Sequence, residues 1–300
     1  MARDFIGYGE SPPDAAWPGG ARVAVSFVLN YEEGGERSVL DGDRITETNL
    51  HEIVGWPEIE ARLLNIESMF EYGSRAGFWR VYRAFTERNL PLTVYAVGQA
   101  LERNPGAARA MAAAGWEVVG HGWRWIDYLD VPEEVEREHI RRTNETIERL
   151  TGERPRGIYV GRTSERTRSL AVAEGLLYDS DSVADDLPYW VDVDGKPHLV
   201  IPYTLDCNDF KFVLAGGFTD GESFYRYMRD TFDQLYEEGG ARPRLMNVGL
   251  HARLVGRPGR TRALCRFLDE IAGRGDVWIT RRVDIAHHWA ATHPPTPSAD

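Results

Sequence analysis

Cysteine is scarce in this chain, whose 300 residues contain two, Cys207 and Cys265, with no paired spacing. This usage argues against a disulfide framework and a cysteine zinc site, so we expect two reduced thiols. Long apolar runs are also lacking. The N-terminus has no stretch of signal-peptide length, and no window reaches the ~20 apolar residues that span a bilayer. The sequence therefore predicts a cytoplasmic protein with no membrane partner.

Positively charged residues are also few, because the chain has 35 Lys and Arg but 47 Asp and Glu, which gives a formal net charge of -12. Nucleic acids are held by clustered cations, so this balance argues against a nucleic-acid partner. Internal repeats and linker-like tracts are lacking too. With 42% hydrophobic residues the chain can bury a large core. We expect one domain over residues 1–300, with an N-terminal extension at about 1–20 and a disordered tail at about 293–300.

What the sequence does contain is an alternation of short apolar runs and segments of helical periodicity. Strand-like runs lie at residues 22–30, 90–98, 116–122, 157–161, 176–182, 199–205, 243–251 and 276–282. Helix-like segments lie at residues 73–89, 104–115, 130–152, 167–175, 221–239 and 259–275. Repeated units of this kind imply a parallel sheet covered by helices, and so many strands favour closure. The predicted fold class is α/β, a distorted parallel (β/α) barrel of about seven strands.

Polar residues follow these runs at the points where the predicted strands end. Reactive groups of a parallel barrel gather at this carboxyl-terminal face. Any one such residue, taken alone, is more often a turn or scaffold residue. Together they would bring carboxylates, imidazoles and a guanidinium to one face: Glu32, Glu33, His121, Arg162, Asp206 and His251. We expect these side chains to line one pocket.

The first strand ends in two adjacent carboxylates, Glu32 and Glu33, which are followed by two glycines. Two carboxylates near low-dielectric walls do not both ionise at their ordinary pKa, so one holds a proton or a cation lies beside it. A carboxylate in this position can take a proton from water. An imidazole opposite it can give a proton to a leaving nitrogen or stabilise an oxyanion. These residue types suit amide hydrolysis.

The motifs around these residues resemble those of the polysaccharide deacetylase (NodB-homology) superfamily, whose fold is a distorted parallel barrel. The sequence has NYEEG where the family has aromatic-Asp-Asp-Gly, HGWRW where it has His-x-x-x-His, and NVGLH at its late Leu-x-Leu-His. In the family these motifs supply a base, metal ligands and an acid. Here Glu32 and Glu33 replace both Asp residues, Trp125 replaces the second His, and YVGRT stands at the usual Arg-x-Pro.

The same departures resemble one branch of that superfamily, the metal-independent allantoinases of purine catabolism. The likeness covers roughly the whole length, in segments such as HGWRWIDY, GRTSERTR, LVIPYTLDCNDFKF and GLHARLVGRPGR. It implies that the hydantoin ring of allantoin is opened to allantoate without a required cofactor, by a homo-oligomer that we expect to be a tetramer. A weakly held metal such as zinc would find only Glu33 and His121 at the inherited positions. Catalytic zinc sites usually have three protein ligands.

On this hypothesis Glu32 activates water, and Glu33 binds ring or urea N–H groups or orients that water. His121 flanks the reacting carbonyl, and His251 protonates the leaving nitrogen. Arg162, or else Arg253 or Arg257, is expected to bind the product carboxylate, because a guanidinium fork suits carboxylates. The predicted substrate-binding residues are Trp125, Tyr159, Arg162, Asp186, Trp190 and Arg253.

Three alternatives stay open at this point. The substrate is another small cyclic ureide or imide, the protein is a metal-dependent N-deacetylase of sugars, or the barrel is a binding subunit without catalysis. Asp186 and Trp190 belong to the stretch SDSVADDLPYW, which we expect to close over the substrate as a loop.

Overall fold

The computed structural model describes residues 3–53, 55 and 57–295, and at its centre lies strand β1 (Val23–Tyr31), with all nine residues buried. Burial of both faces is typical of a parallel strand between two layers. The odd-numbered residues from Val23 to Tyr31 join the core cluster that packs on the helices, whereas Ala24 and Val28 join the cluster inside the curled sheet. Because side chains alternate along a strand, consecutive residues at its end are aimed to opposite sides.

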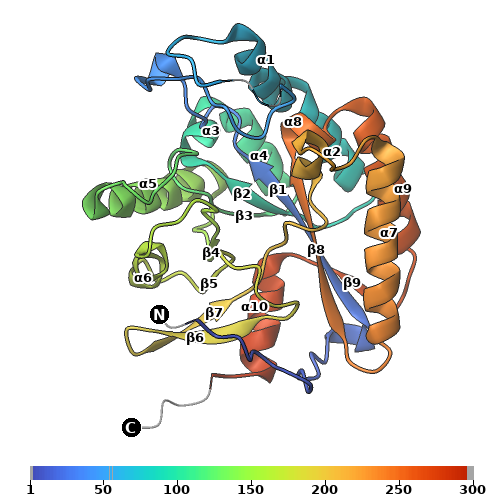
Figure 1. The fold of residues 1–300 in the computed structure, drawn as a ribbon. Helices are drawn as coiled ribbons and strands as arrows, with labels where there is room; N and C mark the ends of the chain where they lie inside the picture. Colours follow the sequence, from blue (N-terminus) through green and yellow to red (C-terminus); the bar gives the residue numbers. More distant parts are fainter. Residues whose placement is uncertain (1–2, 54, 56, 296–300) are drawn as a thin grey trace.

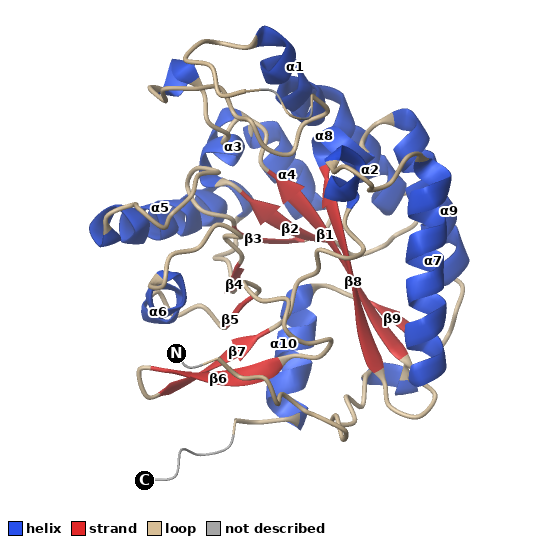
Figure 2. Ribbon diagram, in the orientation of Figure 1, coloured by secondary structure: helices blue, strands red, loops and turns tan. Residues whose placement is uncertain are grey.

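The strands form one curled sheet in the order β6-β7-β5-β4-β3-β2-β1-β8, with β9 paired to the start of β1 (Figure 2). Neighbouring strands are parallel except β6 and β7, which form an antiparallel hairpin. The remaining strands are β2 (Thr93–Ala96), β3 (Glu117–Gly120), β4 (Gly157–Ile158), β5 (Tyr178–Asp179), β6 (Tyr189–Val193), β7 (Lys196–Val200), β8 (Arg244–His251) and β9 (Val277–Ile279).

The predicted fold class is confirmed as an α/β fold with a curled, parallel-rich half-barrel. The strand order has two ends, at β6 and β8, so the sheet is not the closed barrel that the strand count favours. The segment that follows β7 spans the gap. Asn208 forms an isolated parallel bridge with Gly249 of β8, and the Gly249 N–H donates to the Cys207 carbonyl at 2.8 Å. Between this segment and β8, a single bridge and irregular backbone thus take the place of a regular pair of strands.

Helices cover the outer face of the sheet, and α2, α7 and α9 stand beside β1 and β8 in Figure 1. Helix α5 (Glu133–Thr151) is capped by Gly152, which has a left-handed φ of 85°, as its sequence predicts. None of the described helices has the length and apolarity that a membrane crossing requires. The helices are α1 (Leu64–Tyr72), α2 (Phe78–Thr86), α3 (Gly98–Arg103), α4 (Pro105–Ala113), α5 (Glu133–Thr151), α6 (Thr167–Ala173), α7 (Gly221–Glu238), α8 (Ala252–Val255), α9 (Pro258–Ile271) and α10 (Arg282–Thr292), with short turns η1 (Pro18–Gly20), η2 (Val39–Asp41), η3 (Gly73–Gly77) and η4 (Asp209–Val213).

The residues before β1 pack onto the amino-terminal ends of the strands. Trp17 is buried, its Nε1 donates to the Arg244 carbonyl at 2.8 Å, and its ring contacts that of Trp289. At the other end of the chain, the His293 ring stacks on Trp289 and its carbonyl accepts a hydrogen bond from Trp190. Residue 293 of the predicted disordered tail is therefore held by the fold, and residues 296–300 lie outside the described residues.

Candidate active site

Glu32 lies at the carboxyl-terminal end of β1 and continues the row of side chains that face the interior of the sheet. Its Oε1 is 3.2 Å from His121 Nε2, just beyond β3, and 3.5 Å from His251 Nε2, at the end of β8. Its Oε2 is 2.7 Å from Nη1 of Arg253 in α8. The structure thus brings three other predicted site residues, His121, His251 and Arg253, around the Glu32 carboxylate.

Glu33 points to the other side of β1, against η3. A Cβ at Gly73 would lie 2.4 Å from Glu33 Oε1, so only glycine fits beside this carboxyl group. Both of its oxygens accept backbone N–H groups, Oε1 from Arg253 at 3.0 Å and Oε2 from Glu32 at 3.2 Å. This geometry does not support the predicted contact of Glu33 with ring N–H groups. Instead, Glu33 anchors the backbone that carries Arg253.

The pKa values of Glu32 and Glu33 are shifted in opposite directions. Burial acts to raise the pKa of Glu32, but the charges of Arg253 and His251 outweigh it and hold this pKa well below its ordinary value. Burial raises the pKa of Glu33, Arg253 lowers it only in part, and Glu32 raises it further. The sequence predicted either a cation or a retained proton for this pair. The structure shows a guanidinium beside Glu32 and a raised pKa at Glu33.

His251 is oriented by Asp209, a carboxylate that the sequence analysis missed. Asp209 Oδ1 lies 2.7 Å from His251 Nδ1, and Oδ2 accepts the His251 backbone N–H at 2.8 Å. Burial lowers the pKa of His251, but the charges of Glu32 and Asp209 outweigh this effect and raise the pKa to about 9. The imidazole therefore carries two protons at neutral pH and can act as a proton donor.

Asp206, the residue predicted from the strand end, lies instead at the surface, where it pairs with Lys211 at 3.1 Å. Asp206 and Asp209 both belong to the segment LDCNDF, which contained the signal. The turn between them decides which carboxylate faces inward, and the spacing of apolar residues does not reveal it.

His121 is held on two sides. Its Nδ1 lies 2.7 Å from the Tyr159 carbonyl oxygen, and the two rings stack at 5.2 Å. Because a carbonyl oxygen only accepts, Nδ1 carries a proton, and Nε2 faces Glu32 Oε1 at 3.2 Å. Tyr159 is thus brought to the site as predicted, and in this structure it supports His121.

Trp125, which stands at the position of the family's second His ligand, packs against two guanidinium groups. Arg162 Cζ lies 4.0 Å from the ring centroid, and Arg253 Cζ lies 5.1 Å from it. The ring is also buried in the main core cluster. The structure thus shows Trp125 in the core, with cation–π contacts to both arginines, and its predicted role in substrate binding stays a prediction.

The donor set does not fit a catalytic zinc ion. In the part of the chain that the structure describes, no group of three or more His, Cys, Asp or Glu is arranged to hold a metal. The Arg253 Nη1 lies 2.7 Å from Glu32 and 3.5 Å from Glu33, where a cation bound by both carboxylates would have to sit. Both oxygens of Glu33, one of the two inherited ligand positions, already accept backbone N–H groups. The positive charge beside the carboxylates is supplied by a guanidinium.

Residues 45–53, the covering segment, belong to the blue loop that precedes α1 beyond the tip of β1 in Figure 1. Its Leu50 carbonyl accepts a hydrogen bond from Arg253 Nε at 2.9 Å, and its Glu47 Oε2 lies 3.7 Å from Arg162 Nη1. The four residues of the reactive cluster, Glu32, His121, His251 and Arg253, are each between 1% and 4% exposed. A substrate therefore reaches Glu32 only when the structure around it opens.

Asp186 and Trp190 are not joined to this cluster. Asp186 is exposed and lines a separate cavity of about 300 Å³ together with Asp206 and Cys207. Trp190 lies in β6 and donates from Nε1 to the His293 carbonyl at 2.7 Å. The predicted closing loop is in part a strand, because residues 189–193 pair with β7 in a hairpin.

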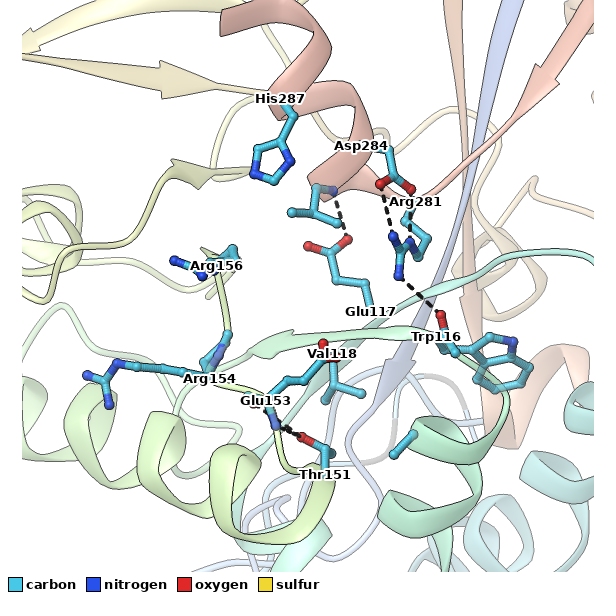
Figure 3. Close-up of a pocket in the computed structure, with 14 residues that line it drawn as sticks. Trp116, Glu117, Val118, Thr151, Glu153, Arg154, Arg156, Arg281, Asp284 and His287 are labelled. Carbon is cyan, nitrogen blue, oxygen red and sulfur yellow. Dashed lines mark hydrogen bonds and ion pairs between the residues drawn. The ribbon is translucent and has the colours of Figure 1, made fainter.

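A larger cavity of about 570 Å³ lies at the opposite ends of the strands, where β3 and α10 begin (Figure 3). Glu117, Arg281 and His287 are among its lining residues, and Arg281 pairs with Asp284 at 2.9 Å. The residues around Glu32 are not among those that line it. This cavity is therefore distinct from the reactive cluster.

Comparisons with known proteins agree with this architecture. A family model described as polysaccharide deacetylase matches residues 65–179. A protein of Schizosaccharomyces pombe (strain 972 / ATCC 24843), named "Putative polysaccharide deacetylase", is 45% identical over 314 residues, which cover 97% of this chain and 98% of that protein.

Two solved structures resemble the whole chain, each at 52% identity and a TM-score of 0.95. One is titled "Crystal structure of probable Polysaccharide deacetylase from Pseudomonas aeruginosa PAO1", and the match covers 99% of this chain and 100% of that one. The other is titled "Crystal structure of Puue Allantoinase", and the match covers 99% of both chains. Identity of 45% to 52% with these relatives over nearly the whole length shows that the chain belongs to the polysaccharide deacetylase family of hydrolases.

Proposed function

We propose that this protein hydrolyses a cyclic amide and opens the hydantoin ring of allantoin to allantoate. The observation that carries the proposal is the surrounding of Glu32. A proton donor, His251, and a fixed cation, Arg253, lie within 3.5 Å of this one carboxylate. The similarity to a protein titled as an allantoinase supports the choice of ring.

The reaction follows from these positions. Glu32 takes a proton from water while the water oxygen adds to the ring carbonyl carbon, and Arg253 stabilises the oxyanion that forms. The ring C–N bond then breaks, and His251 gives its proton to the departing nitrogen. Glu32 returns a proton to His251 across the 3.5 Å that separates Oε1 from Nε2. One water is consumed, and the carboxylic acid that forms releases its proton to solvent, which leaves a carboxylate and a free urea nitrogen.

The low pKa of Glu32 keeps the carboxylate ionised but makes it a weak base in the closed structure. Its Oε2 lies 2.7 Å from Arg253 Nη1, yet neither atom has an aligned hydrogen-bond partner among the described residues. A substrate carbonyl that binds the guanidinium draws it away from Glu32. The pKa of that carboxyl then rises toward the value that suits a general base.

The chemistry of the ring suits a site that uses a guanidinium in place of a metal. The scissile bond of a hydantoin belongs to an imide-like carbonyl, and the adjoining urea carbonyl stabilises the departing nitrogen. Such a bond requires less electrophilic help than the acetamide of a sugar, which benefits from a Lewis acid. The enclosure of Glu32 also favours a small ring over a polymer, because a polymer requires an open groove.

Turnover of a substrate panel by the purified protein and by Glu32→Gln tests the proposal. The panel is allantoin, hydantoin, succinimide, a dihydropyrimidine and an N-acetylated chitooligosaccharide, and the readout is release of a carboxylate. We expect allantoin to be opened fastest, with a loss of about 1,000-fold in kcat for Glu32→Gln. Deacetylation of the sugar without ring opening would overturn the proposal. Ring opening by Glu32→Gln at the wild-type rate would also overturn it.

A further inference from the structure

His51, in the covering segment, is a buried imidazole with one unused nitrogen. It is 3% exposed, and its Nδ1 accepts the backbone N–H of Ile53 at 3.2 Å. Burial lowers the pKa of His51, an effect that Glu47 opposes and Arg253 adds to, so the ring is neutral and Nε2 carries its proton. That Nε2 has no hydrogen-bond partner within residues 3–53, 55 and 57–295. It is a buried donor without an acceptor.

Glu47, four residues earlier, supplies the complementary group. This side chain is 0% exposed, and its Oε1 accepts the backbone N–H groups of Thr48 and Asn49, both at 3.0 Å. Its Oε2 lies 3.7 Å from Arg162 Nη1 and has no hydrogen-bond partner among the described residues. It is a buried acceptor without an aligned donor.

Both groups lie next to the reactive cluster. Leu50, which immediately precedes His51, holds Arg253 through its carbonyl at 2.9 Å. Both terminal nitrogens of Arg253 also lack an aligned partner in the described part of the chain, and one of them is the nitrogen 2.7 Å from Glu32. Unused hydrogen-bonding atoms therefore occur on Glu32, on Arg253 and on the covering segment whose Leu50 carbonyl binds Arg253.

Buried polar groups in proteins are nearly always paired, and an unpaired one costs about 1–3 kcal/mol. Several such atoms beside one reactive carboxylate indicate groups that a ligand pairs. The set contains N–H donors and a carboxylate acceptor. A urea is complementary to such a set, because it presents a carbonyl acceptor and N–H donors in one plane.

We propose that His51 and Glu47 form a subsite for a urea substituent on the substrate ring. His51 Nε2 donates to the urea carbonyl, and Glu47 Oε2 accepts a urea N–H. This inference rests on the proposed function, because it assigns the ureido side chain of that substrate to the covering segment. The subsite distinguishes a ureido-substituted ring from the bare ring.

The test measures kcat/KM for allantoin and for unsubstituted hydantoin with the wild type, His51→Ala, His51→Gln and Glu47→Gln. Loss of a buried hydrogen bond to the substituent lowers the value for allantoin about 10- to 100-fold in His51→Ala and Glu47→Gln. The value for hydantoin changes less than about threefold, because that ring carries no urea to bind. Gln retains an N–H donor, so His51→Gln recovers part of the loss.

Glu52→Gln is the matched control on the same segment. Glu52 pairs with Arg257 at 3.1 Å and with Arg260 at 2.9 Å, so this change loosens the segment without removing a group of the subsite. We expect Glu52→Gln to leave the ratio of kcat/KM for allantoin to kcat/KM for hydantoin unchanged. Thermal unfolding of every variant verifies that the fold is retained.

An equal loss on both rings in His51→Ala and Glu47→Gln would contradict the subsite, because these residues would then only dock the segment. Unchanged values on both rings would contradict it as well. Failure of the proposed function is a separate result, in which the wild type opens another ring and not allantoin. In that case kcat/KM of the same variants is compared for that ring with and without a urea substituent. A loss confined to the substituted ring supports the subsite, and an equal loss on both contradicts it.

Discussion

Two sets of buried charged residues lie against the same curled sheet, and they use their hydrogen bonds differently. At the amino-terminal side, Glu117 accepts from the Tyr178 hydroxyl and from the Thr93 hydroxyl, each at 2.8 Å. Arg282, fully buried, donates to Ser180 and Asn247 and to the carbonyls of residues 201 and 202. We call these residues the basal network, and the hydrogen bonds of its two charged groups are made within the protein.

The reactive cluster at the carboxyl-terminal side is arranged in the opposite way. Glu32 Oε2 and both terminal nitrogens of Arg253 lack aligned partners among the described residues, although each of these residues is buried. A buried charge whose hydrogen bonds are all made within the protein stabilises the packing of the segments it joins. A buried charge with unused hydrogen bonds lowers stability but can still bind a ligand. The comparison teaches that burial of charge alone does not mark an active site. We place the candidate site at Glu32 because its unused oxygen occurs together with the unused nitrogens of Arg253 and with two imidazoles.

Exchange of Arg253 for Met tests the reactive side and has the largest expected effect. The variant loses the cation that stabilises the oxyanion, so kcat for ring opening falls about 100- to 1,000-fold. Steady-state kinetics measures the loss, and the denaturant midpoint shows whether the fold is retained. A variant that keeps wild-type kcat would remove Arg253 from the mechanism.

Exchange of Arg282 for Met tests the basal network and should act on stability. The change leaves Ser180, Asn247 and two carbonyls unpaired in the interior, so the free energy of unfolding falls by about 3–5 kcal/mol. Activity per folded molecule stays close to that of the wild type. Urea unfolding combined with active-site titration separates the two quantities. A stable but inactive variant would break the contrast between the two sets.

Asp209→Asn tests the reactive cluster through the pH dependence of kcat. Ring opening by the wild type should decline as the pH rises through about 9, where His251 loses the proton that it donates. Loss of the Asp209 charge lowers the pKa of His251, so the alkaline limb of the kcat profile moves to lower pH. An alkaline limb that does not move would show that another group limits the rate.

The same titration affects stability. The pKa of His251 is raised above 6.5 on folding. The contribution of this protonated ring to the free energy of unfolding is therefore complete below pH 6.5 and is lost as the pH rises through about 9. Urea unfolding of the wild type and of Asp209→Asn at pH 6 and pH 10 measures this contribution. The difference in free energy between the two proteins should be larger at the lower pH.

Trp125→Leu has the smallest expected effect. The change keeps an apolar side chain in the core but removes the ring that lies under Arg162 and Arg253, which lowers stability by about 1–2 kcal/mol. We expect a modest rise in KM as the two guanidinium groups lose their support. Thermal unfolding and KM for allantoin check both effects, and an unchanged KM would limit Trp125 to core packing.

The fold and the centre of the site follow from patterns that depend on neighbours in sequence. Alternating strands and helices predict the parallel sheet, and the strand ends predict Glu32, His121 and His251. The hairpin of β6 and β7 also had a signal, because Asp194 and Gly195 are a favoured turn pair and both have positive φ. That signal was outweighed by the acidic and aromatic residues that precede it.

Asp209, Glu47 and His51 could not be found in this way. They come from irregular segments, where the direction of each side chain depends on turns and on contacts far along the chain. His51, for example, is brought to Arg253 by a hydrogen bond that spans 203 positions, from Leu50 to Arg253. Apolar periodicity carries no information about such a contact.

In the proposed reaction the charge of Arg253, rather than a metal ion, balances Glu32 and Glu33 while the ring opens. Allantoin turnover by protein stripped with a chelator, with its metal content measured by elemental analysis, tests this role of Arg253. We expect metal-free protein to turn over allantoin at the rate of the untreated protein and to gain nothing from added zinc. Loss of turnover on stripping, restored by one equivalent of zinc or manganese, would contradict it.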